Sequence, residues 1–198
     1  MSGRPASPVP RPGNLAAILR LGRGDATAIT SFGDTPRAFI HSLLPLIALP
    51  LAIAVLTLVR GEATQALADL LAAVCALLVP PVISHLLARH WNREWHWPRF
   101  AVAYNWCQFA LSVLCIALLL VIGALLGGGG ARGGSNAAVV IVALLSVALV
   151  AYGLWLHWFV ARTGLAISGG RAVLVVLVNY AGTFAVLVGR GLLIAERV

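Results

Sequence analysis

Residues 89–108 read RHWNREWHWPRFAVAYNWCQ, and this stretch lies between two long apolar runs. It holds three of the 14 arginines, two of the five histidines and four of the six tryptophans of the chain. Arginine and tryptophan gather where a membrane-spanning segment meets the aqueous phase. The stretch therefore predicts a loop at the edge of a membrane, joining two transmembrane helices.

The composition of the 198 residues also indicates a membrane protein. Hydrophobic residues make up 61% of the chain, charged residues only 10%, and the mean hydropathy is +0.96. Because soluble domains carry about 25% charged residues, a surface this poor in charge needs lipid as its solvent. The net charge of +8 comes from arginines scattered over short segments. They form no continuous basic patch, which argues against nucleic acid as a partner.

Five apolar runs are each 22 or more residues long, enough to cross about 30 Å of hydrocarbon. The predicted fold class is therefore all-α, a polytopic membrane helix bundle with five transmembrane helices. Thr35 followed by Pro36 predicts where the first helix begins, because threonine is a favoured N-cap and proline fits the first helical turn. The expected spans within a membrane domain of residues 38–198 are 38–59, 66–88, 100–126, 137–161 and 172–194.

Residues 1–37 are predicted to form a cytoplasmic N-terminal tail. Residues 1–13 are rich in Pro, Ser, Gly and Arg, a composition typical of disorder. Residues 14–22 place Leu15, Ile18 and Leu19 on one helical face, which suits a short amphipathic helix in the membrane surface. The alternative is a frayed helix within the tail.

Two further features are expected to shape the spans and the connections between them. Pro80 and Pro81 remove two hydrogen-bond donors near the middle of the second span, so we expect a kink there. The Gly-rich residues 127–136 are predicted to be a flexible linker between the third and fourth spans.

The distribution of arginine predicts the orientation of the chain. If the N-terminus is cytoplasmic, ten arginines fall in inner segments and four in outer ones, as the positive-inside rule requires. All six tryptophans and all five histidines then lie at or near the inner face. The absence of lysine is typical of a GC-rich coding sequence. We therefore expect a multi-pass protein of the bacterial inner membrane with a periplasmic C-terminus.

The loop between the second and third spans is expected to lie flat on the inner membrane surface. Its arginines attract anionic lipid headgroups, by about 1 kcal/mol each near the surface, and tryptophan rings suit the headgroup layer. The alternative is a loop whose tryptophans dock into the cytoplasmic end of the bundle. The predicted membrane-interface residues are Arg89, Trp91, Arg93, Trp95, Trp97 and Arg99.

A polar stripe runs along the third span. Asn105, Gln108, Ser112 and Cys115 follow one another at spacings of three, four and three residues, so they share one face of a helix. Such a stripe must face protein or water rather than lipid. It indicates either a polar pathway or ligand pocket, or hydrogen bonds between helices at about 0.6 kcal/mol per contact. We favour the second interpretation.

His85 and His157 lie at matching depths, each four or five residues inside the inner end of a span. Two such histidines could ligate haem or a metal, but no carboxylate joins them, and we expect neither a cofactor nor a metal. With the stripe they complete the candidate polar intramembrane site, which comprises His85, Asn105, Gln108, Ser112 and His157.

Other residues offer less chemistry. Asp69 is the acid furthest inside a span, and its closeness to the helix start favours a role as partner of the helix dipole. No CxxC pair, no Ser-His-Asp order and no paired carboxylates are present in the sequence. The sequence therefore predicts a protein that is not an enzyme.

Three segments carry a resemblance to known proteins: SFGDTPRAFIHSLLPLIALP at residues 31–50, PRFAVAYNWCQ at 98–108 and WFVARTGL at 158–165. Together they resemble a family of small, uncharacterised proteobacterial inner-membrane proteins. The overall plan is distantly similar to the Yip family of five-span membrane proteins, which have a cytoplasmic N-terminus. Eukaryotic Yip proteins interact with Rab GTPases in membrane traffic, whereas the bacterial relatives imply no activity. The resemblance thus implies the fold rather than a mechanism.

The leading prediction of function is a non-enzymatic scaffold that presents its Arg- and Trp-rich loop to a protein partner or to a second copy of itself. The alternative is a small transport-type protein with a polar site between the second and third spans. A third prediction is a haem- or quinone-binding subunit that uses His85 and His157. A water-filled cavity between the second and third spans favours transport, whereas a packed interior favours the scaffold.

Overall fold

Five long helices dominate the computed structural model, which describes residues 13–127 and 136–195. The long helices are α2 (Pro36–Val59), α3 (Ala63–His90), α4 (Trp97–Gly127), α5 (Asn136–Gly164) and α6 (Gly169–Ala195). The short elements are α1 (Asn14–Gly22), η1 (Ala26–Ser31) and η2 (Glu94–His96). No strand occurs among the described residues. The predicted all-α polytopic bundle is confirmed.

Each long helix has the length and composition of a membrane span. Apolar side chains cover the outside of these helices, and Leu120, Leu144 and Phe184 are 65 to 70% exposed. Such surfaces are stable only in lipid, so the chain is an integral, multi-pass membrane protein. The predictions of a disordered tail and of a flexible Gly-rich linker concern residues 1–12 and 128–135, which lie outside the described part of the chain.

The first span begins where the sequence predicts. The Thr35 hydroxyl oxygen accepts a hydrogen bond from the backbone N–H of Ala38 at 3.2 Å, and Pro36 occupies the first helical position. Helix α2 continues through two internal prolines, and α3 continues through Pro80 and Pro81. Both helices thus keep their span length despite the missing donors.

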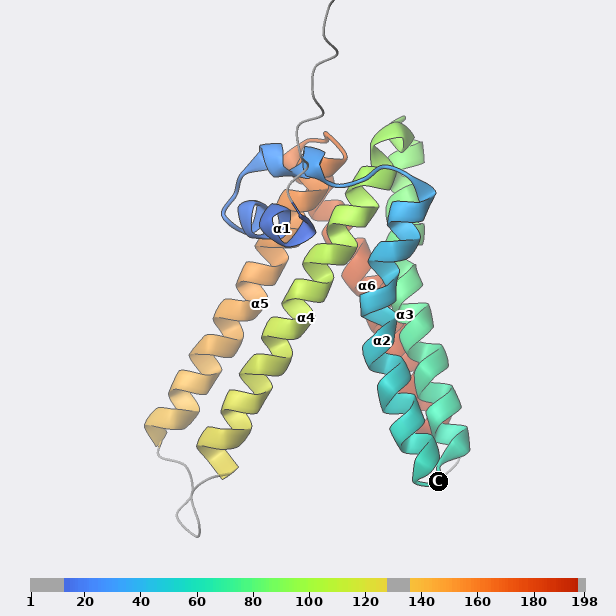
Figure 1. Cartoon of the computed structure of the whole chain (residues 1–198), viewed down its shortest axis with the longest axis vertical. Helices are drawn as coiled ribbons and strands as arrows, with labels where there is room; N and C mark the ends of the chain where they lie inside the picture. The colour runs from blue at the N-terminus through green and yellow to red at the C-terminus, as the bar shows by residue number, and fades with distance from the viewer. Residues whose placement is uncertain (1–12, 128–135, 196–198) are drawn as a thin grey trace, which may run out of the picture.

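The long helices form two legs that diverge from one end of the molecule (Figure 1). Helices α4 and α5 pack on each other as one leg, and α2, α3 and α6 form the other. Helix α6 begins beside α5 and then runs antiparallel along α3. We call the end that holds α1 and η1 the closed end, and the opposite end the open end.

The apolar core sits at the closed end. Phe100, Val160 and Val175 of α4, α5 and α6 are almost completely buried there, as is Leu165 in the turn between α5 and α6. The N-terminal elements contribute Leu21, Ile29 and Phe32 to the same cluster. The closed end is therefore the best packed part of the bundle, and it fixes the point from which the legs separate.

The N-terminal helix lies against the bundle. Ile18 is buried on the core side of α1, whereas Leu15 and Leu19 are exposed, so the predicted apolar face is divided between the bundle and the surroundings. The Tyr152 hydroxyl donates to the backbone oxygen of Gly22 at 3.0 Å and ties the end of α1 to α5. Exposed Leu15 and Leu19 still suit contact with lipid at the membrane surface.

The turn after α1 is held by a charged pair. The Arg20 guanidinium contacts the Asp25 carboxylate at 2.7 Å, and the same carboxylate accepts from the Thr27 hydroxyl and backbone N–H. Hydrogen bonds from Thr27, and then from Arg20, hold the pKa of Asp25 below its usual range. The carboxylate therefore stays charged throughout the neutral range and caps η1.

A close helix contact at the closed end provides a test of the packing. A Cβ atom at Gly164 would lie 3.0 to 3.2 Å from three atoms of Phe100, including its Cα. We expect Gly164→Ala to lower the free energy of unfolding by about 1 kcal/mol, because a backbone atom has little freedom to move aside. Unfolding of purified protein by titration with SDS measures the change.

The matched control is Gly123→Ala on α4, where an added Cβ would meet no atom within 4 Å. That variant should gain about 0.5–1 kcal/mol, since alanine favours a helix more than glycine does. Equal responses of the two variants would contradict the close packing of α4 against α5.

Candidate functional site

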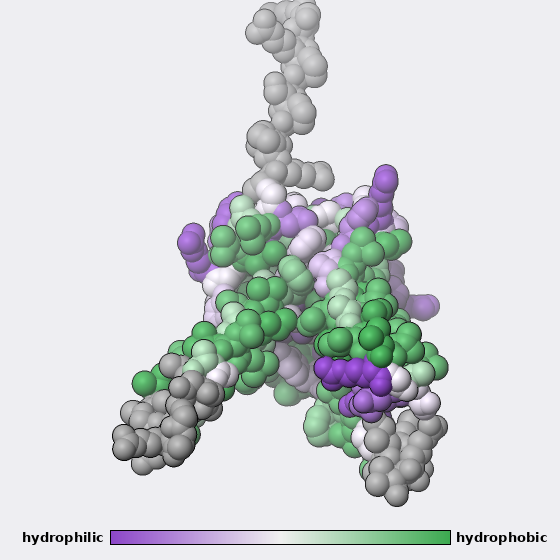
Figure 2. Space-filling view, turned by 60° about the horizontal axis from the view of Figure 1, so that its bottom comes forward, coloured by the Kyte–Doolittle hydropathy of each residue, from purple (hydrophilic) through white to green (hydrophobic). Residues whose placement is uncertain are grey.

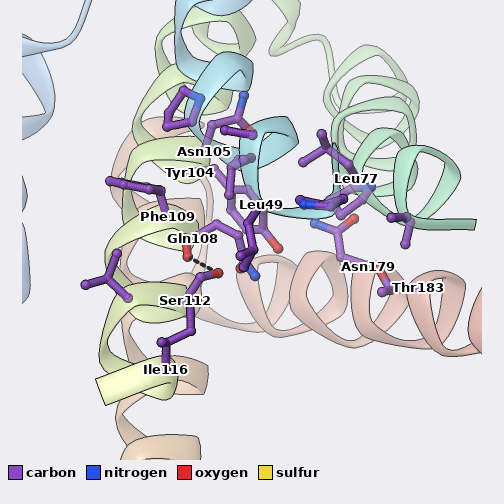
Figure 3. A pocket seen from close by; sticks show the side chains of 18 of the residues that line it. Leu49, Leu77, Tyr104, Asn105, Gln108, Phe109, Ser112, Ile116, Asn179 and Thr183 are labelled. Atoms are coloured by element: carbon purple, nitrogen blue, oxygen red, sulfur yellow. Dashed lines mark hydrogen bonds between the residues drawn. The ribbon is translucent and has the colours of Figure 1, made fainter. Parts of the chain in front are cut away.

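A cavity of about 520 Å³ lies between α2, α3, α4 and α6, inside the membrane-spanning part of the molecule (Figure 3). This volume is within the range of about 300–1,000 Å³ that is usual for ligand sites. Three of the prolines inside helices, Pro45, Pro50 and Pro80, are part of its wall. Its polar lining consists of Tyr104, Asn105, Gln108, Ser112, Asn179, Tyr180 and Thr183.

A second hollow of about 540 Å³ adjoins the first and lies mainly between α4 and α5. The two share wall residues, among them Gln108, Ser112 and Tyr180. Viewed toward the open end, the molecule is hollowed between its two legs, and apolar side chains cover most of both legs, with a hydrophilic patch near the tip of one (Figure 2). The two hollows thus adjoin inside the membrane-spanning part of the molecule, and together we call them the central cavity.

Asn179 of α6 is the most unusual group in the wall of this cavity. The residue is 1% exposed, and neither its amide nitrogen nor its amide oxygen has a hydrogen-bond partner. The Tyr104 hydroxyl lies near this amide, but no hydrogen bond of normal geometry joins them. Figure 3 shows the Asn179 amide on α6 across the cavity from Gln108 on α4. Asn179 is thus positioned to bind a polar group that enters.

His157 of α5 is similarly buried, at 1% exposure. Its Nδ1 forms a hydrogen bond with the Tyr180 hydroxyl at 3.0 Å, and its ring lies 4.6 Å from the Tyr104 ring. The other ring nitrogen, Nε2, is buried without a partner on a residue that lines the second hollow. In a neutral imidazole one ring nitrogen donates and the other accepts. Nε2 is therefore a donor if Nδ1 accepts from Tyr180, and an acceptor if Nδ1 donates to it.

The predicted polar stripe is used in two ways. The Asn105 amide donates to the Ser42 hydroxyl at 2.9 Å, a buried hydrogen bond that joins α4 to α2. The Ser112 hydroxyl donates to the backbone carbonyl oxygen of Gln108, one turn earlier in α4, at 2.9 Å (Figure 3). Gln108 and Ser112 line both hollows. The stripe therefore supplies one contact between helices and also much of one polar wall of the central cavity.

The structure does not bring His85 and His157 to one place. His85 is exposed on α3 and packs edge-on against Trp97, with 4.7 Å between the ring centroids, and it is absent from the lining of both hollows. Among the described residues, no group of three His, Cys, Asp or Glu side chains could hold a metal ion. Of the five predicted site residues, four line the central cavity and His85 does not.

Asp69 has a partner that the sequence did not reveal. The Arg190 Nε donates to an Asp69 carboxylate oxygen at 2.7 Å, and the pair joins the start of α3 to the end of α6. The prediction that Asp69 serves the helix dipole is therefore incomplete. The sequence separation of 121 residues explains why only the tertiary structure identifies the pair.

The loop between α3 and α4 is mostly docked onto the bundle. The Trp97 indole donates to the Ser84 hydroxyl at 3.1 Å, and Trp91 packs on the core, with the Arg171 guanidinium 5.5 Å from the centre of its ring. Arg99 pairs with Asp34 at 2.7 Å. The alternative of docked tryptophans thus describes Trp91 and Trp97. The remaining predicted interface residues Arg89, Arg93 and Trp95 are exposed, and Trp95 is 86% exposed.

This difference predicts which tryptophan touches lipid. In vesicles that contain lipids brominated near the headgroup, Trp95→Phe should remove much of the quenchable fluorescence of the protein, because the exposed ring suits the headgroup layer. Trp91→Phe is the matched control and should remove little. A larger loss from Trp91→Phe than from Trp95→Phe would mean that this loop lies differently against the bilayer.

Comparison of the chain with protein-family models, with curated proteins and with solved structures finds no match. The resemblance to the Yip family therefore stays a prediction. Function has to be inferred from the central cavity and its polar groups.

Proposed function

We propose that this integral membrane protein is of transport type and binds a small uncharged molecule in the central cavity. The observation that carries the proposal is the Asn179 amide, buried in the cavity wall with both polar atoms unpaired. Buried polar groups are normally hydrogen-bonded, and an unpaired one costs about 1–3 kcal/mol. A group maintained at that cost within a cavity is best explained by a ligand that pairs with it.

The chemistry of the wall defines the charge of the ligand. None of the described residues that line either hollow is Asp, Glu or Arg. An ion at this depth would need a countercharge, because charge within a membrane is expensive unless it is paired. The polar groups at the cavity are amides, hydroxyls, one imidazole and the Cys115 thiol. This combination favours an uncharged ligand that is recognised by hydrogen bonds.

The distribution of arginine supports an orientation for this site. Eight of the ten arginines in the described part of the chain lie toward the closed end, and Arg60 and Arg190 lie toward the open end. By the positive-inside rule the closed end is cytoplasmic, and in a bacterial inner membrane the central cavity opens toward the periplasm. A cavity open at one face and closed at the other is what alternating access requires of one state of a transporter.

Thiol accessibility tests the proposal. In a variant that lacks the three native cysteines, Ser112→Cys should react with a small polar methanethiosulfonate added outside intact cells, because Ser112 lines both hollows. Ala103→Cys, at a position that is completely buried, should react much more slowly. Failure of Ser112→Cys to react faster than Ala103→Cys would mean a packed interior and would overturn the proposal.

Two exposed positions serve as controls for orientation in the same experiment. Glu62→Cys in the turn between α2 and α3 should react with an impermeant reagent from outside. Glu94→Cys, at the closed end, should react only after the membrane is opened. Asn92 is less suitable there, because its φ of 55° strains a cysteine. Labelling of Glu94→Cys in intact cells would reverse the orientation.

The scaffold stays a second candidate function because of one observation. Trp95 and, within six residues of it in the sequence, Arg89 and Arg93 are exposed at the closed end and supply aromatic and basic groups there. Such a surface suits anionic headgroups or an acidic protein partner. Copurification from native membranes, compared between the wild type and a Trp95→Ala, Arg93→Ala variant, distinguishes a partner lost with this surface from one that binds elsewhere.

A further inference from the structure

We infer that the ligand of the central cavity is an uncharged membrane amphiphile whose head group both donates and accepts hydrogen bonds, as a hydroxyl or an amide does. The inference rests on the proposed function and specifies its substrate class. Its basis is the combination of unpaired groups at one depth of the bundle, together with the shape of the space that leads away from them.

The unpaired atoms define the head group. Asn179 presents a free N–H donor and a free oxygen acceptor, so a ligand that only accepts, such as an ether, an ester or an oxidised quinone, would leave the Asn179 oxygen unpaired. A hydroxyl or an amide satisfies both atoms. The His157 Nε2 on α5 adds one more donor or acceptor nearby. His157 is hydrogen-bonded to Tyr180, the residue that follows Asn179 in α6.

The depth of these groups explains why the head must be uncharged. Asn179 lies ten residues into α6, which is roughly 15 Å from the helix start at 1.5 Å per residue. That distance is about half of the roughly 30 Å hydrocarbon thickness. A charged head held there would lack a countercharge among the described lining residues, whereas a hydroxyl needs only the hydrogen bonds that Asn179 and His157 offer.

The second hollow suits the apolar chain of such a molecule. Between the polar groups and the open end, its walls are large apolar residues of α4 and α5, namely Leu118, Leu119, Ile122, Leu149 and Val150. Helix α4 runs toward the open end and α5 returns from it, so these residues lie further out than Gln108 and His157. An acyl or prenyl chain in this space would contact both helices along its length.

Competition for photolabelling tests the head group. The protein in phosphatidylcholine nanodiscs is irradiated with a long-chain alcohol that carries a diazirine in mid-chain, and the labelled peptides are mapped by mass spectrometry. Dodecanol and its isomer methyl undecyl ether then compete at equal mole fraction in the lipid. We expect labels on α4 and α5, and competition by the alcohol that is roughly tenfold or more stronger than by the ether, which leaves a buried acceptor unpaired.

A variant assigns the difference to the proposed group. Asn179→Leu should remove the preference for the alcohol, whereas Asn92→Gly, which removes an exposed loop amide at a φ of 55°, should keep it. Equal competition by the alcohol and the ether in the wild type, or stronger competition by dodecylammonium, would overturn the inference while leaving a ligand in the cavity. Absence of labels on α4 and α5 would overturn the proposed function as well.

Discussion

Replacing Asp69 with alanine is expected to lower the free energy of unfolding by about 2–3 kcal/mol. The carboxylate pairs with Arg190 across the contact between α3 and α6, and the variant leaves a guanidinium without its partner beside apolar surfaces. Removing one member of a buried pair costs about 3–5 kcal/mol. We expect less here, because the Asp69 and Arg190 side chains are still 24% and 36% exposed.

Double substitution separates the pair from the loss of either residue alone. Asp69→Leu combined with Arg190→Leu should recover most of the lost stability, because the unpaired charge is removed as well. Asp69→Leu alone and Arg190→Leu alone should each destabilise the protein. SDS titration in mixed micelles measures all three variants. If the double variant is as unstable as the sum of the single ones, the two side chains act independently and the ion pair does not join α3 to α6.

The long spans were predictable from sequence because lipid imposes a simple rule on them. A helix must satisfy its own backbone hydrogen bonds and expose apolar side chains over the thickness of the bilayer. The run from Ala38 to Val59 meets both demands, and its N-cap at Thr35 follows from local chemistry alone. Nothing in that rule depends on which helices become neighbours, so the spans can be found one at a time.

Contacts between spans were much less predictable. Asp69 and Arg190, or Trp97 and Ser84, meet because two helices pack in one register, and apolar periodicity contains little information about register when both faces of a helix are apolar. The tryptophans of the loop show the same limit. The arginine and tryptophan content of the loop is the same whether the rings face lipid or dock on the bundle. Composition alone therefore cannot decide between the two arrangements.

The candidate site was predictable in part. The spacing of Asn105, Gln108 and Ser112 places them on one face, but spacing alone cannot separate a packing contact from a cavity wall. The structure shows both roles: Asn105 bonds to Ser42 and also lines the first hollow, whereas Gln108 and Ser112 line both hollows. Asn179 is a single polar residue in an apolar run, and only its surroundings show that its amide is unpaired.

Asn179→Leu is expected to raise the free energy of unfolding by about 1–3 kcal/mol in the absence of ligand, because it removes an unpaired buried amide. Leucine is close in size to asparagine, and the substitution lies in the wall of the central cavity. Stabilising substitutions of this kind are typical of functional sites, where a protein keeps a group that binding requires and folding does not.

Asn105→Leu is the matched control, with the same chemical change on a residue that also lines the cavity. Its amide is bonded to the Ser42 hydroxyl, so this variant should lose stability, by about 0.6 kcal/mol or somewhat more. Both residues are almost completely buried. Opposite signs for the two substitutions would therefore show that hydrogen bonding, and not burial, causes the difference. SDS titration of delipidated protein measures both.

The nearby Tyr104 hydroxyl provides the outcome that would contradict this prediction. If a small movement lets Tyr104 bond to the Asn179 amide, then Asn179→Leu would lower stability and Tyr104→Phe would lower it to a similar degree, with non-additive effects in the double variant. The amide would then be a structural group between α4 and α6. If Asn179→Leu gains stability and its effect simply adds to that of Tyr104→Phe, then no protein group depends on the Asn179 amide. The amide is then free for a ligand.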